Sequence, residues 1–577
     1  MDILIVAGGT GSIALQTGLK ELIPHCKITV LTNLYDDGKS TGYCRKVMNI
    51  LGPSDLRKNQ YIQWKNKKVI DKRIEYIFET RFNNLTKLLA HKIIKNCNFD
   101  EYTTEIFTKS IDLFFKNAPH EVLNDFNLIN IIYSGLFQIL GYYETIYFMK
   151  DFLQIEDDVV LNSCENRTLA AITKNMKWII GEANIADYNN AEDYIEDICM
   201  RKNSSDTSIP FLDKNAEEAI EKADLIIFSS GSQWSLITIY KTLGFSDAID
   251  RSKAKKIMIM NNTDDTDMTG RDASFIIEKI NKYVINFKRD FTIFFNLNAY
   301  NLMSDDSNIG VKKYTAFMGY IDGKHHPYSL AYNILKFYYN INFDEDDILM
   351  MDFDDTLFSR NTIDKKISIE NMEIFNKISA RIKSYIVSGN SYDTIKNKIS
   401  SIFGVNLELA KFTLYCDGGL VEYKNNKITN IHKKYLIPIK LIDTIKKKIQ
   451  NDLKEEVKFI YKGKDTTGKN LMCLSITGLD NEYRHLLYSY LTNYLLKNYK
   501  NLYITEAGKS TIDIYKKNHD KSKIFEMLNF KNKNIIYIGD ELESGNDKII
   551  ATKVNQAIKV DNVYDTNVLL RLIYNEC

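Results

Sequence analysis

The sequence is short of proline, of paired cysteines and of net charge. Only 6 of its 577 residues are proline, so no proline-rich hinge marks a domain boundary. The 8 cysteines are scattered and form no Cys-x-x-Cys pair, which argues against a disulfide scaffold or a zinc site and favours a reducing cytoplasm. A net charge of +1 creates no overall field that would attract nucleic acid or an anionic membrane, and we expect neither as a partner.

The sequence also offers neither a secretory signal nor an apolar run of membrane length. Its N-terminus lacks a basic region followed by a cleavable apolar stretch, so we expect no leader. The most apolar long segment is Phe126–Tyr143, which carries Asn130, Ser134 and Gln138 and therefore predicts a buried helix instead of a membrane span. The lysine run at 446–448 has polar, helical surroundings and indicates a solvated face.

The length and the order of the expected elements predict more than one domain, since single cores stop growing near roughly 250–300 residues. The first half alternates apolar strands with amphipathic helices such as Ser12–Leu22 and Ala216–Lys222. This alternation predicts an α/β domain with a mostly parallel sheet, whose ligands lie at the carboxyl ends of the strands. The expected strands are Asp2–Ala7, Lys27–Asn33, Asp224–Ser230, Lys256–Met260 and Phe291–Asn296.

The second half predicts another sheet of this kind, with a boundary near Asn342. An insertion at about 392–504 has the strand-like stretches and helices of an α+β cap. We therefore expect two α/β, Rossmann-like domains with mostly parallel sheets, residues 1–342 and 346–577, the second carrying the inserted cap. The expected core strands are Ile348–Asp352, Ser384–Ser388 and Asn534–Gly539, and those in the insertion are Phe412–Cys416, Gly419–Tyr423 and Leu471–Ile476.

Two aspartates follow the first strand of the second half. Asp352 and Asp354 stand in the pattern Asp-x-Asp-x-Thr, which Thr356 completes. One carboxylate at a strand end can attack phosphorus and form an aspartyl-phosphate, while the other exchanges protons with the leaving oxygen and with water. Mg²⁺, a hard ion that prefers oxygen ligands, is needed to offset the charge of a carboxylate and a phosphate brought together.

Three further groups follow in the order that this chemistry requires. Ser388 ends the next strand and can hydrogen-bond the transferring phosphoryl group. Lys521 opens a helix and can neutralise the phosphate, with Lys523 as its nearest competitor for that role. Asp540 and Asp547 follow the last strand and can supply carboxylates to the metal.

These four motifs, in this order, resemble the haloacid dehalogenase superfamily over the whole C-terminal segment. The resemblance implies that Asp352 is the nucleophile and Asp354 the acid/base, and that Ser388 and Lys521 bind phosphate. It implies a Mg²⁺ site with Asp547 as a direct or an outer partner, the full set of metal residues being Asp352, Asp354, Asp540 and Asp547.

The insertion looks like the cap of the sugar-phosphatase and phosphomannomutase branch of that superfamily. The segment Tyr415–Leu420 is similar to that branch, as is the spacing of glycines and acids after the last strand. Such a cap implies that Lys509 and Asp513 face the active site, while a surface role for them stays open. One departure is Asn390, where many relatives have arginine after Ser/Thr-Gly.

A glycine-rich loop follows the first strand of the N-terminal half. Gly8, Gly9, Thr10 and Gly11 form a turn whose N–H groups can approach an anion at the start of a helix. The pattern is not Gly-x-Gly-x-x-Gly and no acidic residue closes the second strand, so an NAD enzyme is not expected. A purely structural turn is the alternative.

Two more loops carry the carboxylates, hydroxyls and cations that suit a metal-bound diphosphate. They are Tyr35–Gly42, which includes Asp37, and Gly52–Asn59, which includes Asp55. A third loop, Ser229–Ser235, follows a buried strand and offers hydroxyl and N–H groups to another phosphate.

Together these segments resemble the family of 2-phospho-L-lactate transferase and its gluconeogenesis-factor relatives over about residues 1–340. The matching pieces are Gly8–Gly11, Asp36–Gly42, Pro53–Asn59, Asp125–Leu128, Gly181–Ile185, Ser229–Ser235, 261–266 and 326–331. Departures from the usual pattern are Lys39, Ser54, Ser229 and Ser230.

One branch of that family transfers a phospholactyl group from a guanosine diphosphate carrier to a flavin-like acceptor, with Mg²⁺. The other binds uridine diphosphate sugars and has regulatory roles. The segment Gly181–Ile185 looks more like the regulatory branch. Trp234 and Tyr35 can stack on a base or pack in the core. The resemblance assigns Asp37 and Asp55 to metal or acceptor, and it assigns nucleotide or phosphate contacts to Gly8, Gly9, Thr10, Gly11, Asn127 and Ser232.

We therefore expect a bifunctional biosynthetic enzyme that uses Mg²⁺. Its C-terminal half is expected to hydrolyse a small phosphorylated metabolite such as a sugar phosphate, and its N-terminal half to move a phosphorylated group from a GDP- or UDP-linked carrier. Two alternatives stay open: the N-terminal half is a nucleotide-sugar sensor that regulates the phosphatase, or the C-terminal half is a phosphomutase. A homo-oligomer is compatible with the sequence.

Overall fold

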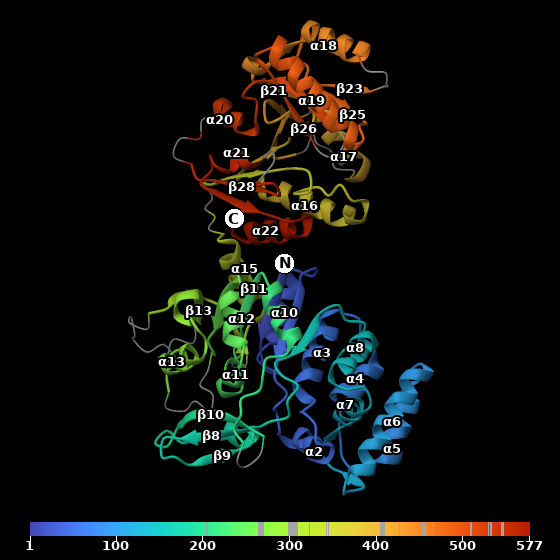
Figure 1. Ribbon diagram of the computed structural model, residues 1–577, viewed down its shortest axis with the longest axis vertical. Helices are drawn as coiled ribbons and strands as arrows, with labels where there is room; N and C mark the ends of the chain where they lie inside the picture. The colour runs from blue at the N-terminus through green and yellow to red at the C-terminus, as the bar shows by residue number, and fades with distance from the viewer. Residues whose placement is uncertain are drawn as a thin grey trace. The chain divides into compact units, whose positions relative to one another are not determined.

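The computed structural model contains two compact units, Met1–Tyr338 and Tyr339–Cys577 (Figure 1). Among the described residues, no helix has both the length and the apolar character to cross a bilayer, and the seven cysteines are free thiols. The described residues are 1–577 without 203–205, 263–270, 298–309, 322–323, 342, 344–345, 404–409, 426, 453–456, 466, 508–510, 529, 531–532, 544–546 and 577.

The N-terminal unit is built on a seven-stranded sheet in which every neighbouring pair is parallel. The central strands β1 (Asp2–Val6) and β11 (Leu225–Phe228) are almost wholly buried apolar runs, as expected of strands covered on both faces. This sheet confirms the α/β fold class. Its order is β14-β13-β12-β11-β1-β2-β7, with β2 (Lys27–Thr32), β7 (Asp158–Leu161), β12 (Lys255–Ile259), β13 (Phe291–Asn296) and β14 (Lys312–Ala316).

A group of helices separates β2 from β7 in the chain (Figure 1). The segment expected as one buried helix is divided: α7 (Leu128–Ile139) is buried, and Gly141, with a φ of +88°, precedes α8 (Tyr142–Leu153). The other elements here are α2 (Lys39–Met48), α3 (Ser54–Asn66), α4 (Lys72–Glu79), α5 (Lys87–Cys97), α6 (Glu101–Asn117) and the short pairs β3 (Arg81–Phe82) with β6 (Phe126–Asn127) and β4 (Leu85–Thr86) with β5 (Val122–Leu123).

A small antiparallel sheet of order β10-β8-β9 lies apart from the large one in this unit. Its strands are β8 (Thr168–Thr173), β9 (Trp178–Ile180) and β10 (Ile195–Arg201). The remaining elements are α1 (Ile13–Leu22), α9 (Glu182–Ala186), α10 (Lys214–Lys222), α11 (Gln233–Tyr240), α12 (Phe245–Arg251), α13 (Ala273–Tyr283), α14 (Phe287–Asp290), β15 (Tyr320–Ile321), β16 (Lys324–His325) and α15 (Pro327–Tyr339).

The C-terminal unit has a second seven-stranded sheet, of order β21-β20-β19-β18-β17-β28-β29. Five neighbouring strands are parallel, and β20 and β21 extend the sheet as antiparallel strands. The strands are β17 (Ile348–Met351), β18 (Lys383–Val387), β19 (Thr413–Cys416), β20 (Val421–Lys424), β21 (Lys427–Ile431), β28 (Ile535–Gly539) and β29 (Gln556–Lys559), and the helices are α16 (Lys365–Ile378), α17 (Tyr392–Phe403), α20 (Ile524–Met527), α21 (Asp547–Ala551) and α22 (Val563–Glu576).

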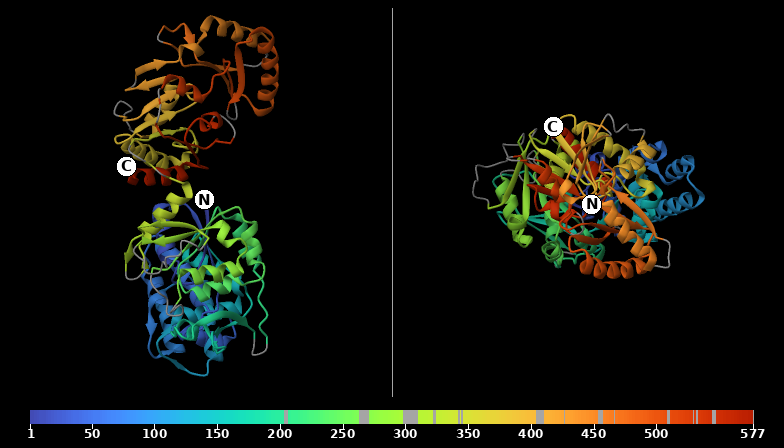
Figure 2. Two further views of the ribbon diagram at one scale, coloured as in Figure 1. Left: turned by 90° about the vertical axis from the view of Figure 1, so that its left-hand side faces the viewer. Right: turned by 90° about the horizontal axis from the view of Figure 1, so that it is seen from above.

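The inserted cap has its own four-stranded antiparallel sheet, of order β23-β25-β27-β26. The helices α18 (Ile439–Asp452) and α19 (Asn481–Asn498) share an isoleucine- and leucine-rich core with this sheet (Figure 2). The strands are β22 (Ile437–Pro438), β23 (Lys458–Lys462), β24 (Asn470–Leu471), β25 (Cys473–Thr477), β26 (Leu502–Ala507) and β27 (Thr511–Lys516).

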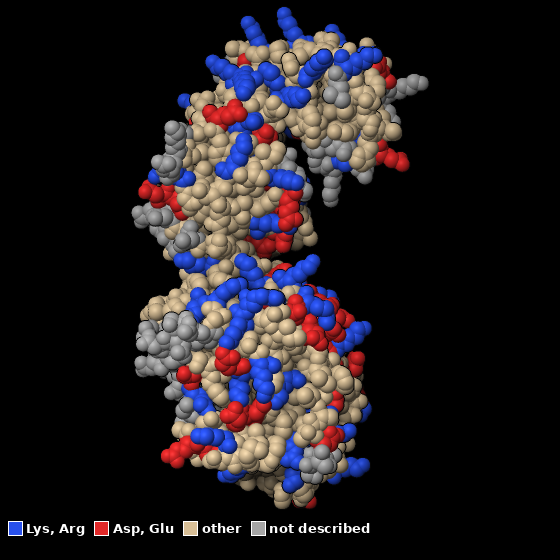
Figure 3. Space-filling model, turned by 60° about the vertical axis from the view of Figure 1, so that its left-hand side comes forward, with Lys and Arg blue, Asp and Glu red and all other residues tan. Residues whose placement is uncertain are grey.

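The limits of this cap differ from the expected 392–504. Two strand stretches expected within the insertion, β19 and β20, hydrogen-bond into the core sheet, where β19 pairs with β18. The separate cap sheet and its helices span 437–516 instead. Basic side chains gather over the cap on the face drawn in Figure 3. Within the cap, Lys446 lies over the rings of Phe459 and Tyr461.

Gly135 of α7 allows this helix to approach α6 closely. A methyl group at this position would overlap the Cα and Cβ atoms of Ser110 on α6. Because overpacking of such a contact is unfavourable, we expect Gly135→Ala to lower the free energy of unfolding of the N-terminal unit by about 1–3 kcal/mol. Urea denaturation followed by circular dichroism measures this.

Gly8→Ala is the matched control, since its added methyl would lie 3.7 Å from the nearest heavy atom, an Asp55 carboxylate oxygen. An unchanged midpoint for Gly135→Ala would contradict the close contact between the two helices.

Candidate functional site

Three neighbouring parallel strands of the C-terminal sheet end beside the predicted catalytic groups. Asp352 follows β17, Ser388 follows β18 and Asp540 follows β28 directly. The registers of these strands bring their carboxyl ends to the same level. Their polar side chains therefore share one edge of the sheet, which is where ligands bind in open α/β folds.

Lys521 lies between two carboxylates and is buried with them. Its Nζ donates hydrogen bonds of 2.5 Å to Asp352 Oδ1 and 2.5 Å to Asp547 Oδ1, and none of the three residues is more than 7% exposed. Burial raises the pKa of Asp352 to about 8, which Lys521 opposes and the charge of Asp547 favours. Burial acts to lower the pKa of Lys521, but the two carboxylates outweigh it and raise that pKa above its ordinary value.

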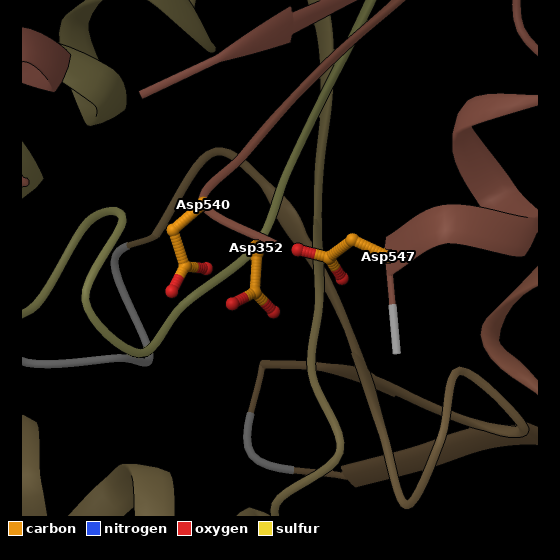
Figure 4. A group of neighbouring side chains, drawn as sticks. All are labelled: Asp352, Asp540 and Asp547. Carbon is orange, nitrogen blue, oxygen red and sulfur yellow. The ribbon is translucent and has the colours of Figure 1, made fainter. Parts of the chain in front are cut away.

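Carboxylate oxygens of Asp352, Asp540 and Asp547 lie within 4.8 Å of one another (Figure 4). Asp547 Oδ2 is buried without a hydrogen-bond partner among the described atoms, and Thr356 Oγ1 donates to Asp540 Oδ1 at 3.3 Å. Hard oxygen donors, one of them unsatisfied, fit a small divalent cation such as Mg²⁺.

The carboxylate of Asp354 does not belong to this acidic group, although the sequence predicts Asp354 as a metal ligand too. Asn390 Nδ2 donates to its Oδ2 and Lys398 Nζ to its Oδ1, each at 2.5 Å. The sequence singled out Asn390 only as a departure from the superfamily, and it gave no signal for Lys398. A lysine on the helix after Ser388 has no fixed spacing from Asp354 that a motif could record.

Ser388 and Lys521 both line the cavity that contains Asp352, as expected of phosphate-binding residues. The Oγ atom of Ser388 accepts a hydrogen bond of 3.1 Å from the N–H of Asn390, which fixes the hydroxyl in the loop. Lys523, the competitor of Lys521, instead forms ion pairs with Asp520 and Glu526.

Two cavities adjoin each other between the core sheet and the cap. The first, of about 280 Å³, holds Asp352 and Asp354 and receives Lys462 and Asp513 from the cap. The second is larger, about 500 Å³, and it shares Gly389, Asp513 and Lys521 with the first. Asp513 therefore lines both cavities, while its predicted companion, residue 509, lies outside the described residues. Cap residues around the second cavity are Tyr503, Thr505 and Tyr515.

Asp417 is a second buried carboxylate, located after β19. It is 2% exposed, and both its carboxylate oxygens lack a hydrogen-bond partner among the described atoms. A Cβ on Gly463 of the cap would lie 2.9 Å from Asp417 Oδ2, so the cap backbone covers the carboxylate. Burial raises the pKa of Asp417 to about 7, Lys462 opposes the rise, and Asp513 adds to it.

In the N-terminal unit, glycines let the three predicted loops come together. A methyl group on Gly9 would overlap the carboxylate of Asp55, and one on Gly11 would overlap the carbonyl oxygen of Ser230. The carbonyl oxygen of Gly8 accepts a hydrogen bond of 3.2 Å from Asn59 Nδ2. The loop after β1 thus contacts both the loop at 52–59 and the loop at 229–235.

Asp37 joins these loops to the first turn of α9. Its Oδ1 accepts a hydrogen bond of 2.9 Å from the N–H of Ala183, and Ser235 Oγ donates to Glu182 Oε1 at 3.0 Å. Glu182 lies in the segment matched to the regulatory branch, but sequence reasoning did not propose it as a site residue.

Burial perturbs two acids of this group. It raises the pKa of Asp55 to about 6, which Lys58 opposes and the charge of Asp36 favours. It raises the pKa of Glu182 to about 7, and Asp36 adds to that rise. Carboxylates gathered in this way favour a proton or a cation nearby.

The other predicted contacts of this unit have varied surroundings. Asn127 Nδ2 donates to the carbonyl oxygens of Phe78 and Thr80, so this amide links the chain around β6 to the end of α4. Ser232 precedes α11, and Thr10 is exposed in the first loop. Trp234 and Tyr35 are each 1% exposed and pack in the core, which leaves no ring face for a base.

The fold and these sites define an α/β protein with two mostly parallel sheets, each bearing a cluster of acidic side chains near the carboxyl ends of its strands. The family described as 2-phospho-L-lactate transferase CofD matches residues 3–306, more than half of the chain, and the chain belongs to that family.

Named relatives cover the same half. A gluconeogenesis factor of Thermotoga maritima is 29% identical over 287 residues, 49% of this chain and 76% of the relative. One of Streptococcus pyogenes serotype M3 is 25% identical over 260 residues, 44% of this chain and 66% of the relative.

Solved structures resemble each unit separately. Protein BH3568 of Bacillus halodurans has a TM-score of 0.44 at 21% identity and covers 58% of this chain and 98% of its own. A haloacid dehalogenase-like hydrolase of Bacteroides thetaiotaomicron has a TM-score of 0.31 at 11% identity and covers 40% of this chain and 99% of its own.

The raised pKa of Asp417 predicts that the stability of the C-terminal unit depends on pH. Because the folded-state pKa is about 7 and the ordinary value is 3.8, the unfolded carboxyl ionises first as pH rises. The free energy of unfolding therefore falls between about pH 4 and pH 7, and Asp417→Asn is expected to flatten this slope. Urea titrations at pH 4.5 and 7.5 measure it.

Asp561→Asn, which changes a carboxylate with a 75% exposed side chain, should retain the wild-type slope. Equal slopes for Asp417→Asn and wild type would show that Asp417 is not the group responsible.

Proposed function

We propose that the C-terminal unit is a Mg²⁺-dependent phosphate-ester hydrolase with Asp352 as its nucleophile. The observation that carries this proposal is the buried contact of Asp352 with Lys521 beside Asp540 and Asp547, at the floor of a cavity that Asp354 also lines. A nucleophile, a cation for phosphate, a set of metal ligands and an acid/base are thereby gathered within one cavity.

The reaction proceeds in two steps. In the first, an oxygen of Asp352 forms a bond to phosphorus, the ester P–O bond breaks, and the leaving oxygen takes a proton from Asp354. In the second, water attacks the aspartyl-phosphate, gives a proton to Asp354, and the bond to Asp352 breaks as phosphate is released. Lys521 and Ser388 hold the phosphoryl group. Asp352, Asp540 and Asp547 would hold Mg²⁺, which would offset negative charge on the phosphate.

The substrate of this reaction is a phosphomonoester with a leaving group of about the size of a sugar. The smaller cavity contains the reacting carboxylates, and the larger one extends from it under the cap. The walls of the larger cavity carry hydroxyls on Tyr503, Thr505 and Tyr515, which can hydrogen-bond a polyol. These features support a sugar phosphate as substrate.

For the N-terminal unit we propose transfer of a phosphorylated group from a nucleoside diphosphate carrier. Family membership and the glycine loop beside Asp55 support this. A second function, sensing of a nucleotide sugar, is favoured by the relatives named as gluconeogenesis factors. With two phosphate-handling sites in one chain, the product of one site would reach the other at a raised local concentration.

The nucleophile is tested by Asp352→Asn in the full chain with Mg²⁺. We expect phosphate release from a panel of sugar phosphates to fall by at least about 10³-fold, because no aspartyl-phosphate can form. Asp561→Asn should retain wild-type turnover.

Retained activity in Asp352→Asn would contradict the assignment of Asp352 as the nucleophile. An isomeric sugar phosphate formed by wild type without free phosphate would favour a mutase.

The N-terminal function is tested in the same Asp352→Asn chain, in which the hydrolase is silent. Phosphorus NMR follows guanosine and uridine diphosphate conjugates with and without a flavin-like acceptor. We expect the nucleoside monophosphate to form only when the acceptor is present, and Asp55→Asn to slow this by about 100-fold, as for loss of one positioned charge. Binding without turnover would support the sensor instead.

A further inference from the structure

Lys398 forms an ion pair with the proposed acid/base residue. It lies on α17, ten positions after Ser388, and its Nζ is 2.5 Å from Asp354 Oδ1. The side chain is 29% exposed and that of Asp354 is 15% exposed. Its Nζ also lies 5.8 and 5.9 Å from the ring centroids of Phe353 and Phe358. The lysine is therefore seated against an aromatic surface next to the reacting groups.

Two donors hold the two oxygens of Asp354 separately. Lys398 binds Oδ1, and the Nδ2 atom of Asn390 binds Oδ2 at 2.5 Å. Asn390 is itself fixed, since its N–H donates to Ser388 Oγ and its carbonyl oxygen accepts from the N–H of Asp417. With one donor on each oxygen, rotation of the carboxylate about its last bond is restricted.

Arg360 contributes less to this arrangement. Its Nη2 is 3.9 Å from Asp354 Oδ2, beyond hydrogen-bond range, and its side chain is 57% exposed. A solvent-exposed ion pair of this length adds little constraint. Among the described cations, Lys398 is the one that contacts Asp354 at hydrogen-bond distance.

The orientation of Asp354 matters because proton transfer to the leaving oxygen must accompany the attack by Asp352. Misplacement of a catalytic group by about 1 Å can cost about 100-fold in rate. A flexible carboxylate would sample such positions, whereas the two hydrogen bonds set its plane before substrate binds.

We propose that Lys398 is a positioning residue that orients the side chain of Asp354, which carries a proton when it protonates the leaving group and is the ion-paired carboxylate when it takes a proton from water. The proposal rests on the proposed phosphatase function of the C-terminal unit. It assigns to α17 a part in catalysis that none of the four sequence motifs contains.

The test compares two substrates that differ in how much they need an acid. The alkoxide of a sugar phosphate requires a proton as it leaves, whereas p-nitrophenolate is a stable anion and leaves without one. In the full chain with Mg²⁺, we expect Lys398→Met to lower kcat/KM for the sugar phosphate by about 10- to 100-fold, and that for p-nitrophenyl phosphate by less than about threefold.

Three variants sharpen this comparison. Lys398→Arg, which keeps the charge and donors, should recover most of the sugar-phosphate activity. Lys396→Met removes an exposed lysine of the same helix and should match wild type. If Lys398→Met does not fold, Lys398→Gln is measured in the same way.

A double-mutant cycle supplies an independent readout. If Lys398 acts through Asp354, Lys398→Met should not lower the sugar-phosphate activity of Asp354→Asn any further. If Lys398→Met lowers the activity of Asp354→Asn by as large a factor as it lowers that of wild type, the proposal is overturned. Equal losses of activity on both substrates in Lys398→Met, or no loss at all, would also overturn it. Failure of the proposed function is distinguishable, because it would appear as unchanged activity in Asp352→Asn.

Discussion

The burial of Lys521 between Asp352 and Asp547 is the constraint on which the C-terminal site depends. The three charges lie away from water, and removing one partner of such a buried group typically costs about 3–5 kcal/mol. Asp352 follows β17, whereas Lys521 precedes α20 and Asp547 opens α21, both of which are short helices near the end of the chain. The contact is possible only because β17 and β28 are neighbours in the sheet. The sheet order brings the two carboxylates together, and Lys521 balances their charge.

Buried carboxyl groups with raised pKa values are common to both units. Burial raises the pKa of Asp352 and Asp417 in one unit and of Asp55 and Glu182 in the other. Structures rarely retain such groups without use, since each disfavours its charged form and raises the cost of folding at neutral pH. In each unit the acids lie near glycine-rich backbone that a phosphate could approach. A cation bound there could contact both the carboxylates and the phosphate.

Departures from the expected motifs have local physical consequences. Lys39 stands where relatives usually have glycine, and its backbone retains a φ of +43°, a conformation that costs a side-chain-bearing residue about 1–2 kcal/mol. Asn390 stands where many relatives have arginine, and its amide binds one oxygen of Asp354 while Lys398 binds the other. The first departure places a side chain on a residue with a positive φ, and the second changes which side chains surround a carboxylate.

The two α/β sheets, the strand ends and the order of the motifs could be predicted from the sequence, because apolar periodicity and strand-end glycines and acids are local signals. For example, β13 has the bounds expected for it. Tertiary structure decided which sheet each strand joins, so that β19 and β20 belong to the core and not to the cap. It also decided that the Asn127 amide donates hydrogen bonds to the chain at the end of α4, that Glu182 accepts a hydrogen bond from Ser235, and that Lys398 reaches Asp354. These contacts depend on segments that pack together from distant positions, and spacing along a single chain does not record such distances.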